Sequence, residues 1–265
     1  MGLLRRHAIN LVSGRPRDAT FALYTAVLAD KAAILPDAIP FTDGAVVPFA
    51  LEAAVCALSV TEPGTALPGV ATPALGLPYP SLEPAPSGKM LIVYGGSSSV
   101  GSMVIQLATA AGLDVISIAS AHNFEFNRRC GAVQVFDYHD ALFVEKAAAA
   151  AAGAGRGFVG IFDAVATPET YANDLAILAR LGGGHLACVH PPPENVPENV
   201  NAGMIFGVND VATPVWRDYV TAALQVGKLK CLPSPLVVGK GLEKIQEALK
   251  MCEAGVSATK LVVEL

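Results

Sequence analysis

Hydrophobic and polar positions between residues 89 and 120 follow two different patterns in turn, a continuous apolar run and a helical period. Residues 90–94 form a continuous apolar run rich in β-branched and aromatic side chains, which is typical of a buried strand. Over residues 100–108, apolar side chains recur at three- and four-residue spacing, which predicts an amphipathic helix ending near Gly112. Residues 115–118 are a second apolar strand candidate. A strand, turn, helix and strand within about thirty residues predict a βαβ unit, because parallel strands need such a crossover.

The same alternation continues almost to the end of the chain. Thr167 and Pro168 are the expected N-cap and first residue of one further helix. Alternating strands and helices without an internal repeat predict an α/β fold, a doubly wound parallel sheet with right-handed crossovers. The later helices are expected at residues 123–129, 141–152, 168–181, 214–226 and 241–254. The later strands are expected at residues 133–136, 158–164, 184–190, 202–208 and 257–263.

The first third of the chain has a weaker pattern. Residues 19–34 alternate loosely and predict one or two strands, and residues 44–59 predict a helix. These elements cannot close a sheet or bury a core by themselves. Residues 61–88 are rich in proline and glycine and are interpreted as a linker or surface loop.

Composition narrows the classes of function. With 52% hydrophobic and 15% charged residues, the chain is not of the disordered class. A net charge of -5 gives no basic field for nucleic acid. The mean hydropathy of +0.47 is high, yet no run reaches the ~18 uninterrupted apolar residues of a spanning helix, and no signal peptide is evident. We therefore expect a cytoplasmic protein without a membrane partner.

The five cysteines are scattered and form no CxxC pair. This pattern favours reduced thiols over a disulfide framework and gives no set of residues with zinc-ligand spacing. No metal site is expected.

The turn at residues 95–101, GGSSSVG, joins the first strand to the first helix. Gly96, Ser98 and Gly101 stand at the three glycine positions of a G-x-G-x-x-G fingerprint, which seats a pyrophosphate on a helix N-terminus in the Rossmann fold. The serines at 97–99 add hydroxyl donors for phosphate oxygens. A plain turn with an N-cap serine is the alternative interpretation.

The end of the second strand bears on which dinucleotide is bound. NAD sites usually carry an acid there, about twenty residues on, for the ribose 2′-hydroxyl. This chain has Ala119 to Asn123, ASAHN, with no acid. Ser120, His122 and Asn123 can donate hydrogen bonds to a 2′-phosphate, so we expect NADP(H) rather than NAD.

In these motifs the sequence resembles the medium-chain dehydrogenase/reductase superfamily, in particular its zinc-independent quinone oxidoreductase and fungal trans-acting enoyl reductase-like branch. The resemblance covers about residues 7 to 265. The resemblance rests on these segments: LPYP at 77–80, VYGGSSSVG at 93–101, IQLA at 105–108, AGL at 111–113, SAHNF at 120–124, CGA at 130–132, FDY at 136–138 and SATKLVV at 257–263.

The resemblance implies roles for further residues. Tyr138 is similar to the family tyrosine beside the 2′-phosphate, and Ala164, Val165 and Val189 to the backbone that lines the nicotinamide ribose. His190 is more simply a structural histidine. The expected cofactor-binding set is Gly95, Gly96, Ser97, Ser98, Ser99, Val100, Gly101, Ser120, His122, Asn123, Tyr138, Ala164, Val165 and Val189.

The resemblance also implies a domain organisation. It begins late inside the GroES-like catalytic domain of the family, so we expect an N-terminally truncated member. We expect a GroES-like remnant with a connecting helix at 1–60, a linker at 61–88, the Rossmann domain at 89–230, and a helix and strand at 231–265 that return to the remnant. Residues 202–208 are the candidate edge strand of a homodimer.

The expected function is an NADP(H)-dependent, zinc-independent oxidoreductase. It would transfer a hydride to an activated C=C or C=O of a small organic substrate, such as an enoyl, enone or quinone. We assign no catalytic residue, because Glu52 and Ala53 stand where family members often carry a threonine facing the nicotinamide. A truncated domain that binds NADP(H) without turnover is the alternative, and a metal-dependent alcohol dehydrogenase is a weaker third.

Overall fold

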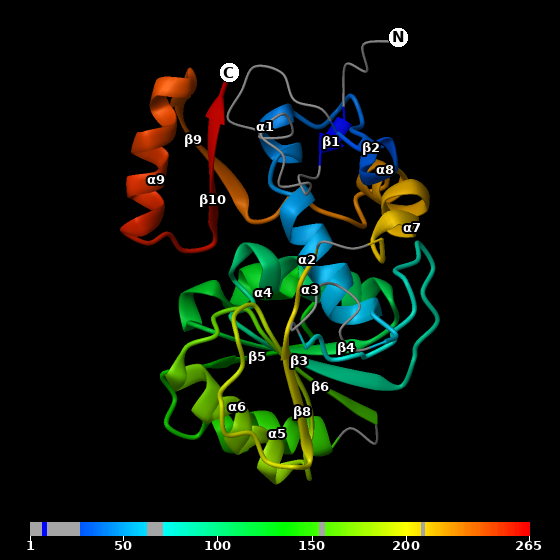
Figure 1. Cartoon of the computed structure of the whole chain (residues 1–265), viewed down its shortest axis with the longest axis vertical. Helices are drawn as coiled ribbons and strands as arrows, with labels where there is room; N and C mark the ends of the chain where they lie inside the picture. The colour runs from blue at the N-terminus through cyan, green and yellow to red at the C-terminus, as the bar shows by residue number, and fades with distance from the viewer. Residues whose placement is uncertain (1–6, 10–26, 63–70, 154–156, 208–209) are drawn as a thin grey trace.

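The centre of the protein is a six-stranded parallel sheet (Figure 1). The computed structural model describes residues 7–9, 27–62, 71–153, 157–207 and 210–265. The strand order is β5-β4-β3-β6-β7-β8, so the chain winds outward from β3 in both directions and the expected doubly wound sheet is confirmed. The strands are β3 (Lys89–Tyr94), β4 (Asp114–Ala119), β5 (Gln134–Asp137), β6 (Gly157–Asp163), β7 (Gly184–Cys188) and β8 (Val200–Met204).

Both faces of the sheet are covered by helices, as a parallel sheet requires. Leu91 and Val93 of β3 join the core on one face, and Met90 and Ile92 join the core on the other, following the two-residue period of a strand. The first face packs against α2 (Pro48–Ser59), α3 (Ser99–Ala110) and α4 (Phe124–Cys130). The second packs against α5 (Phe143–Ala152) and α6 (Pro168–Arg180).

The predicted start of α6 is confirmed. The Thr167 hydroxyl accepts the N–H of Thr170 at 3.3 Å, and the Thr170 hydroxyl accepts the N–H of Thr167 at 3.0 Å. Pro168 follows as the first helical residue. The two threonines thus satisfy backbone donors at the helix start reciprocally.

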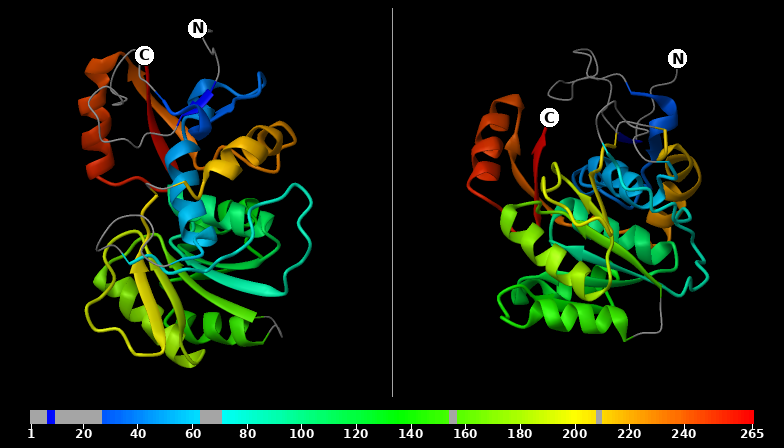
Figure 2. Two further views of the ribbon diagram at one scale, coloured as in Figure 1. Left: turned by 45° about the vertical axis from the view of Figure 1, so that its right-hand side comes forward. Right: turned by 60° about the horizontal axis from the view of Figure 1, so that its bottom comes forward.

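The remaining elements gather at the carboxyl end of the sheet, and α2 connects the two parts (Figure 2). The antiparallel strands β1 (His7–Ile9) and β2 (Ala32–Ile34) lie there with α1 (Phe41–Gly44). A second helical segment comprises α7 (Thr213–Val215), a π-helical turn at Trp216–Val220 and α8 (Thr221–Gln225). A C-terminal unit, β9 (Ser234–Lys240), α9 (Ile245–Glu253) and β10 (Thr259–Glu264), completes the fold.

Several predicted boundaries were wrong in this part of the chain. The helix expected at 44–59 begins at Pro48, which fixes the first helical residue, and a separate turn of helix precedes it. Of the strands expected at 19–34, residues 10–26 lie outside the described residues, and only Ala32–Ile34 is a strand in the rest. Strand β8 begins at Val200 and ends at Met204. Strand β9 was not predicted, because its residues are mixed polar and apolar.

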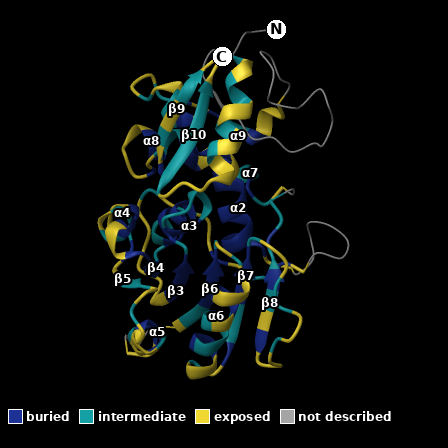
Figure 3. Cartoon of the chain, turned by 90° about the vertical axis from the view of Figure 1, so that its left-hand side faces the viewer, coloured by how far each residue is buried: buried dark blue, intermediate teal, exposed yellow. Residues whose placement is uncertain are grey.

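Helix α2 is the apolar link between the two parts (Figure 3). The stretch Phe41–Ser59 is long and apolar enough to cross a membrane by composition, but 67% of it is buried inside the protein. Glu52 on this helix is 3% exposed and accepts the indole N–H of Trp216 at 2.6 Å, with the Lys31 ammonium 3.6 Å away. Burial of this stretch against α3 and Trp216 is the pattern of a core helix.

The described end of the predicted linker, residues 71–88, is bonded to the Rossmann sheet, whereas residues 63–70 lie outside the described residues. Residues 71–88 contain no helix or strand, in agreement with the sequence. Thr72 donates its hydroxyl to the carbonyl of Met204, at the edge strand β8. At the other end, Ser87 donates its N–H and its hydroxyl to the carbonyl of Gly112, both at 2.8 Å.

Replacing Gly112 by alanine is expected to reduce the free energy of unfolding by about 2–4 kcal/mol. About 1–2 kcal/mol arises from its left-handed φ of +84°, and the rest from a Cβ that would lie 2.1 Å from the carbonyl oxygen of Ala85. The matched control is Gly182→Ala, where φ is +82° and no atom lies within 4 Å of the added Cβ. Urea denaturation measures both variants. Equal losses would show that residues 85–87 do not pack on this turn.

Candidate cofactor-binding site

The turn between β3 and α3 has no room for side chains at its three glycines. A Cβ on Gly95, whose φ is +75°, would lie 2.5 Å from Cγ2 of Val165. A Cβ on Gly96 would lie 2.1 Å from the hydroxyl of Ser117, and one on Gly101 would lie 2.4 Å from the carbonyl oxygen of Gly95. The bare backbone therefore closes tightly over the sheet and brings the start of α3 to the surface of the turn.

The three serines have different surroundings. Ser98 is the N-cap of α3 and accepts the N–H of Gly101 at 3.0 Å, which explains a serine at the middle position of the fingerprint. The hydroxyl of Ser97 accepts the side-chain amide of Asn127 at 3.1 Å. The N–H groups and hydroxyls of this turn lie at the positive end of a helix of 12 residues, an arrangement that suits an anion.

A cation that the sequence did not predict lies beside this turn. Lys260, on β10, donates from its ammonium group to the hydroxyl of Ser99 at 3.1 Å. The same ammonium lies 5.8 Å from the ring centroid of Phe49. Burial lowers the pKa of Lys260 below its ordinary value. The tail SATKLVV was recognised as a strand, but the pairing of β10 with β9 that aims Lys260 at α3 has no local signal.

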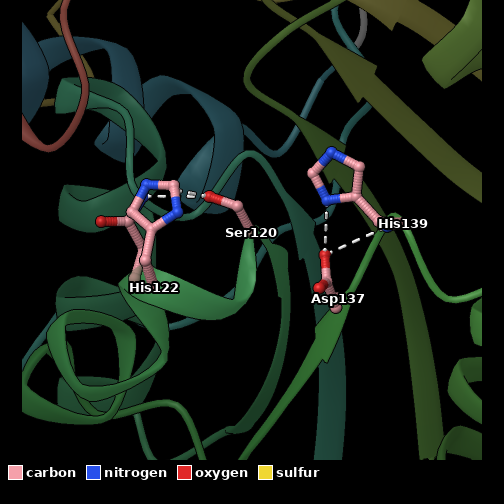
Figure 4. A network of polar contacts seen from close by, with 5 residues as sticks. Ser120, His122, Asp137 and His139 are labelled. Atoms are coloured by element: carbon pink, nitrogen blue, oxygen red, sulfur yellow. Dashed lines mark hydrogen bonds and ion pairs between the residues drawn. The ribbon is translucent and has the colours of Figure 1, made fainter.

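A polar cluster lies beyond the carboxyl end of β4 (Figure 4). The side-chain amide of Asn123 donates to the hydroxyls of Ser120 at 3.2 Å and Ser257 at 3.1 Å. The Nε2 atom of His122 lies 3.3 Å from the Ser120 hydroxyl. Three of these residues were expected from the sequence, and Ser257 of the C-terminal unit was not.

An acid is present on the neighbouring strand. Asp137 ends β5, and its carboxylate accepts the N–H of His139 at 3.0 Å, with Nδ1 of the same histidine 2.9 Å away (Figure 4). The N–H of His139 holds the pKa of Asp137 below its usual range. The ring of Tyr138 lies 4.2 Å from the His139 ring, centroid to centroid.

These features surround one cleft of about 1310 Å³ between the carboxyl edge of the sheet and the C-terminal unit. Its floor is polar, and the facing wall from α1, α9 and β10 is largely apolar, with Phe41, Leu249 and Leu261 among its residues. Of the expected site residues, the cleft is lined by Gly95, Ser97, Ser98, Ser99, Ser120, Asn123, Tyr138 and Val165.

The other six expected residues do not line the cleft. Gly96 and Gly101 are buried within the turn, and His122 is exposed beside Ser120. Val100, Ala164 and Val189 are half-buried and pack against the core cluster that includes α3. Ser99 and Val165, which are next to Val100 and Ala164 in the chain, line the cleft in their place.

No group of three histidine, cysteine, aspartate or glutamate side chains within the described ranges is placed to hold a metal ion. All five cysteines carry free thiols. Glu52, named above beside the expected nicotinamide face, is instead turned into the core against Trp216.

Comparisons with known proteins agree with this architecture. A family model described as zinc-binding dehydrogenase matches residues 99–212. The chain is 68% identical to the dehydrogenase orsE of Emericella nidulans over 261 residues, covering 98% of this chain and 75% of that protein. It is 36% identical to the trans-enoyl reductase himH of Aspergillus japonicus, covering 98% of this chain and 72% of that protein.

Solved structures share the fold at low identity. An alcohol dehydrogenase superfamily protein from Novosphingobium aromaticivorans aligns with a TM-score of 0.65 at 19% identity, over 93% of this chain and 70% of that one. A mycobacterial protein solved with NADPH aligns with a TM-score of 0.62 at 20% identity, over 89% of this chain and 69% of that one. With a parallel sheet, a glycine–serine turn and relatives of this similarity, the chain belongs to the medium-chain dehydrogenase/reductase superfamily of oxidoreductases, alongside fungal dehydrogenases and trans-enoyl reductases.

Proposed function

We propose that this protein is an NADP(H)-dependent, zinc-independent oxidoreductase. The observation that carries the proposal is the meeting of the glycine turn, the start of α3 and Lys260 at the polar floor of one cleft. The cradle fits a pyrophosphate, because side chains are absent where backbone must approach, and because N–H groups, hydroxyls and a cation converge there. Bound NADPH would supply the hydride, and the protein would supply binding and orientation.

The choice of NADP(H) over NAD(H) is supported by the end of β4. Ser120, Asn123 and Ser257 offer hydroxyl and amide donors and no charge of their own. The nearest acid on the next strand, Asp137, is already engaged by two nitrogen atoms of His139. The mycobacterial structure with NADPH shares this fold.

The apolar wall supports a small organic substrate with an activated C=C or C=O. Helix α9 has no buried residue, and its side chains Ile245, Ala248 and Leu249 line the cleft. Such a wall excludes water and favours the binding of apolar substrate groups over charged ones. Relatives named trans-enoyl reductase, and the similarity in fold to the CurK enoyl reductase (TM-score 0.60, 15% identity), fit an enoyl, enone or quinone acceptor.

Binding without turnover is the second candidate function. The chain spans 72–75% of the length of these two relatives, and we assign no acid, base or nucleophile among the described residues that line the cleft. Hydride transfer requires the substrate to be held against the cofactor in a site closed to water. Whether the cleft walls of this chain can hold the substrate so therefore decides between turnover and binding alone.

We also propose a cytoplasmic protein, with no nucleic-acid or membrane partner, that pairs through β8 into a homodimer.

Fluorescence titration with NADPH tests the proposal directly. We expect saturable binding at micromolar concentration, and no saturation below millimolar concentration would overturn it. Oxidation of NADPH is then followed with a panel of enones and quinones. Consumption of NADPH supports the oxidoreductase, and binding without consumption by any member supports the second candidate.

Substituting Lys260→Met is expected to raise the dissociation constant for NADPH about 10- to 100-fold, because a hydrogen bond to a charged group contributes ~1.5–3 kcal/mol. In the unsubstituted protein, affinity should also fall as alkaline pH removes the ammonium charge, at a lower pH than an exposed lysine would show. Lys250→Met, on the exposed side of α9, is the control. Equal affinities for the two variants would remove Lys260 from the site.

The variant Ser120→Asp is expected to reverse the cofactor preference. A carboxylate there repels a 2′-phosphate and accepts a hydrogen bond from a 2′-hydroxyl, so the dissociation constant should rise for NADPH and fall for NADH. Ser120→Asn, which is uncharged and similar in size, serves as the matched variant. If both variants change the two constants alike, charge at residue 120 does not select the cofactor.

A further inference from the structure

Two buried carboxyl groups lie where the end of β6 meets α6. Asp163 ends β6 and Asp174 lies on α6, and both are 0% exposed. The Asp163 carboxylate accepts the N–H groups of Val165 at 2.8 Å and Ala166 at 2.9 Å, and the hydroxyl of Thr170 at 2.5 Å. Three donors stabilise a negative charge on Asp163.

Asp174 has the opposite surroundings. Neither of its side-chain oxygens accepts a hydrogen bond from any described residue. It lies on α6 one turn before the buried Ile177 and Leu178, which belong to the apolar core on the α5 and α6 face of the sheet. A charged carboxylate without donors in such a place is strongly disfavoured, whereas a neutral carboxylic acid carries its own donor.

We propose that Asp163 and Asp174 share one proton, carried by Asp174 and donated to Asp163, and that the pair acts as positioning residues for the turn at 164–166, whose Val165 lines the cofactor cleft. Thr170, one turn before Asp174 on α6, donates to the Asp163 carboxylate, so α6 carries Asp174 on the side that meets the end of β6. Two carboxyl groups close together in a region of low polarity do not both ionise. The donors on Asp163 decide which one holds the charge.

The turn that the pair holds is unusual. Ala166 has a φ of +59°, a left-handed conformation that a residue with a side chain rarely adopts. The Asp163 carboxylate receives the N–H of this residue and of the one before it, so it compensates for the strain. Val165 lines the cleft, and its side chain occupies the space that a side chain on Gly95 would need.

Helix α6 connects the pair to a second loop of the cleft side. Tyr171 donates its hydroxyl to the carbonyl of Pro191 at 2.7 Å, in the loop after β7. The buried face of α6 therefore supports the loops that follow both β6 and β7. In open parallel sheets, ligands bind at these carboxyl-end loops.

The ionisable groups around Asp174 are Asp163 from β6, Tyr94 from β3, Tyr171 on the same helix and Cys188 from β7. Among them, Asp163 is the group whose charge disfavours a second negative charge on Asp174. Burial, and then the charge of Asp163 and the hydrogen bond between the two groups, raise the pKa of Asp174 well above its ordinary value. Burial also raises the pKa of Tyr94 to about 12, so this phenol stays neutral as well.

The sign of the pH effect follows from this. Because the folded protein keeps a proton that the unfolded chain releases near pH 4, stability is complete below that pH and decreases as pH rises toward the folded-state pKa. Asp174→Asn carries a neutral N–H donor of the same shape and does not titrate. The variant should therefore become progressively more stable than the unsubstituted protein as pH rises.

The test is urea denaturation of both proteins without cofactor at several pH values from 5 to 9. We expect the ratio of their unfolding constants to rise with pH, by up to about tenfold per unit. Glu169→Gln removes an exposed carboxylate from the same helix and should leave the pH dependence unchanged. A ratio independent of pH for Asp174→Asn would overturn the shared proton.

A second measurement does not depend on the folding of a variant. The infrared spectrum of the unsubstituted protein at pH 7 should contain the C=O stretch of a protonated carboxylic acid, and a spectrum with carboxylates alone would contradict the proposal. The link to the cofactor rests on the proposed function and is tested separately. Affinity for NADPH should fall with alkaline pH more steeply in the unsubstituted protein than in Asp174→Asn, and parallel profiles would confine the pair to a role in stability.

Discussion

The structure depends on the close contact between the turn after β3 and the elements around it. At Gly95, Gly96 and Gly101, an added Cβ would lie within 2.1–2.5 Å of Val165, Ser117 or the turn's own backbone. These contacts fix the start of α3 relative to β4 and to the turn after β6, because neighbouring atoms pack directly against the glycine backbone and leave no space between. The N-terminal end of α3 is thereby set at the carboxyl edge of the sheet, beside its two central strands β3 and β6.

The sequence predicted the parts of this arrangement that depend on local patterns. The strands from Lys89 to Cys188 follow from short apolar runs, the helices follow from helical spacing, and the N-cap of α6 follows from Thr167 and Pro168. The glycine turn was identified because its spacing and its position between a strand and a helix are both local. The acid-free end of β4 was equally visible, and Ser120 and Asn123 indeed line the cleft.

What the sequence could not provide was the set of contacts between distant segments. Lys260 meets Ser99 across 161 positions, and Ser257 meets Asn123 across 134. Glu52 is an acidic residue on a largely apolar helix, and its buried partners are the indole of Trp216, 164 positions away, and the ammonium group of Lys31. Asp163 and Asp174 looked like ordinary residues of a strand end and a helix, since burial without donors has no local signature.

The contact between Lys260 and Ser99 has a consequence for the order in which the molecule assembles. Each βαβ unit of the sheet joins segments that are near in the chain, so the entropy lost in closing it is small. The contact of Lys260 closes a loop of 161 positions, and Lys260 lies on the strand that pairs with β9. The sheet and its glycine turn can thus form as an early, locally determined unit, whereas the ammonium group at the proposed anion site comes from the last strand of the chain.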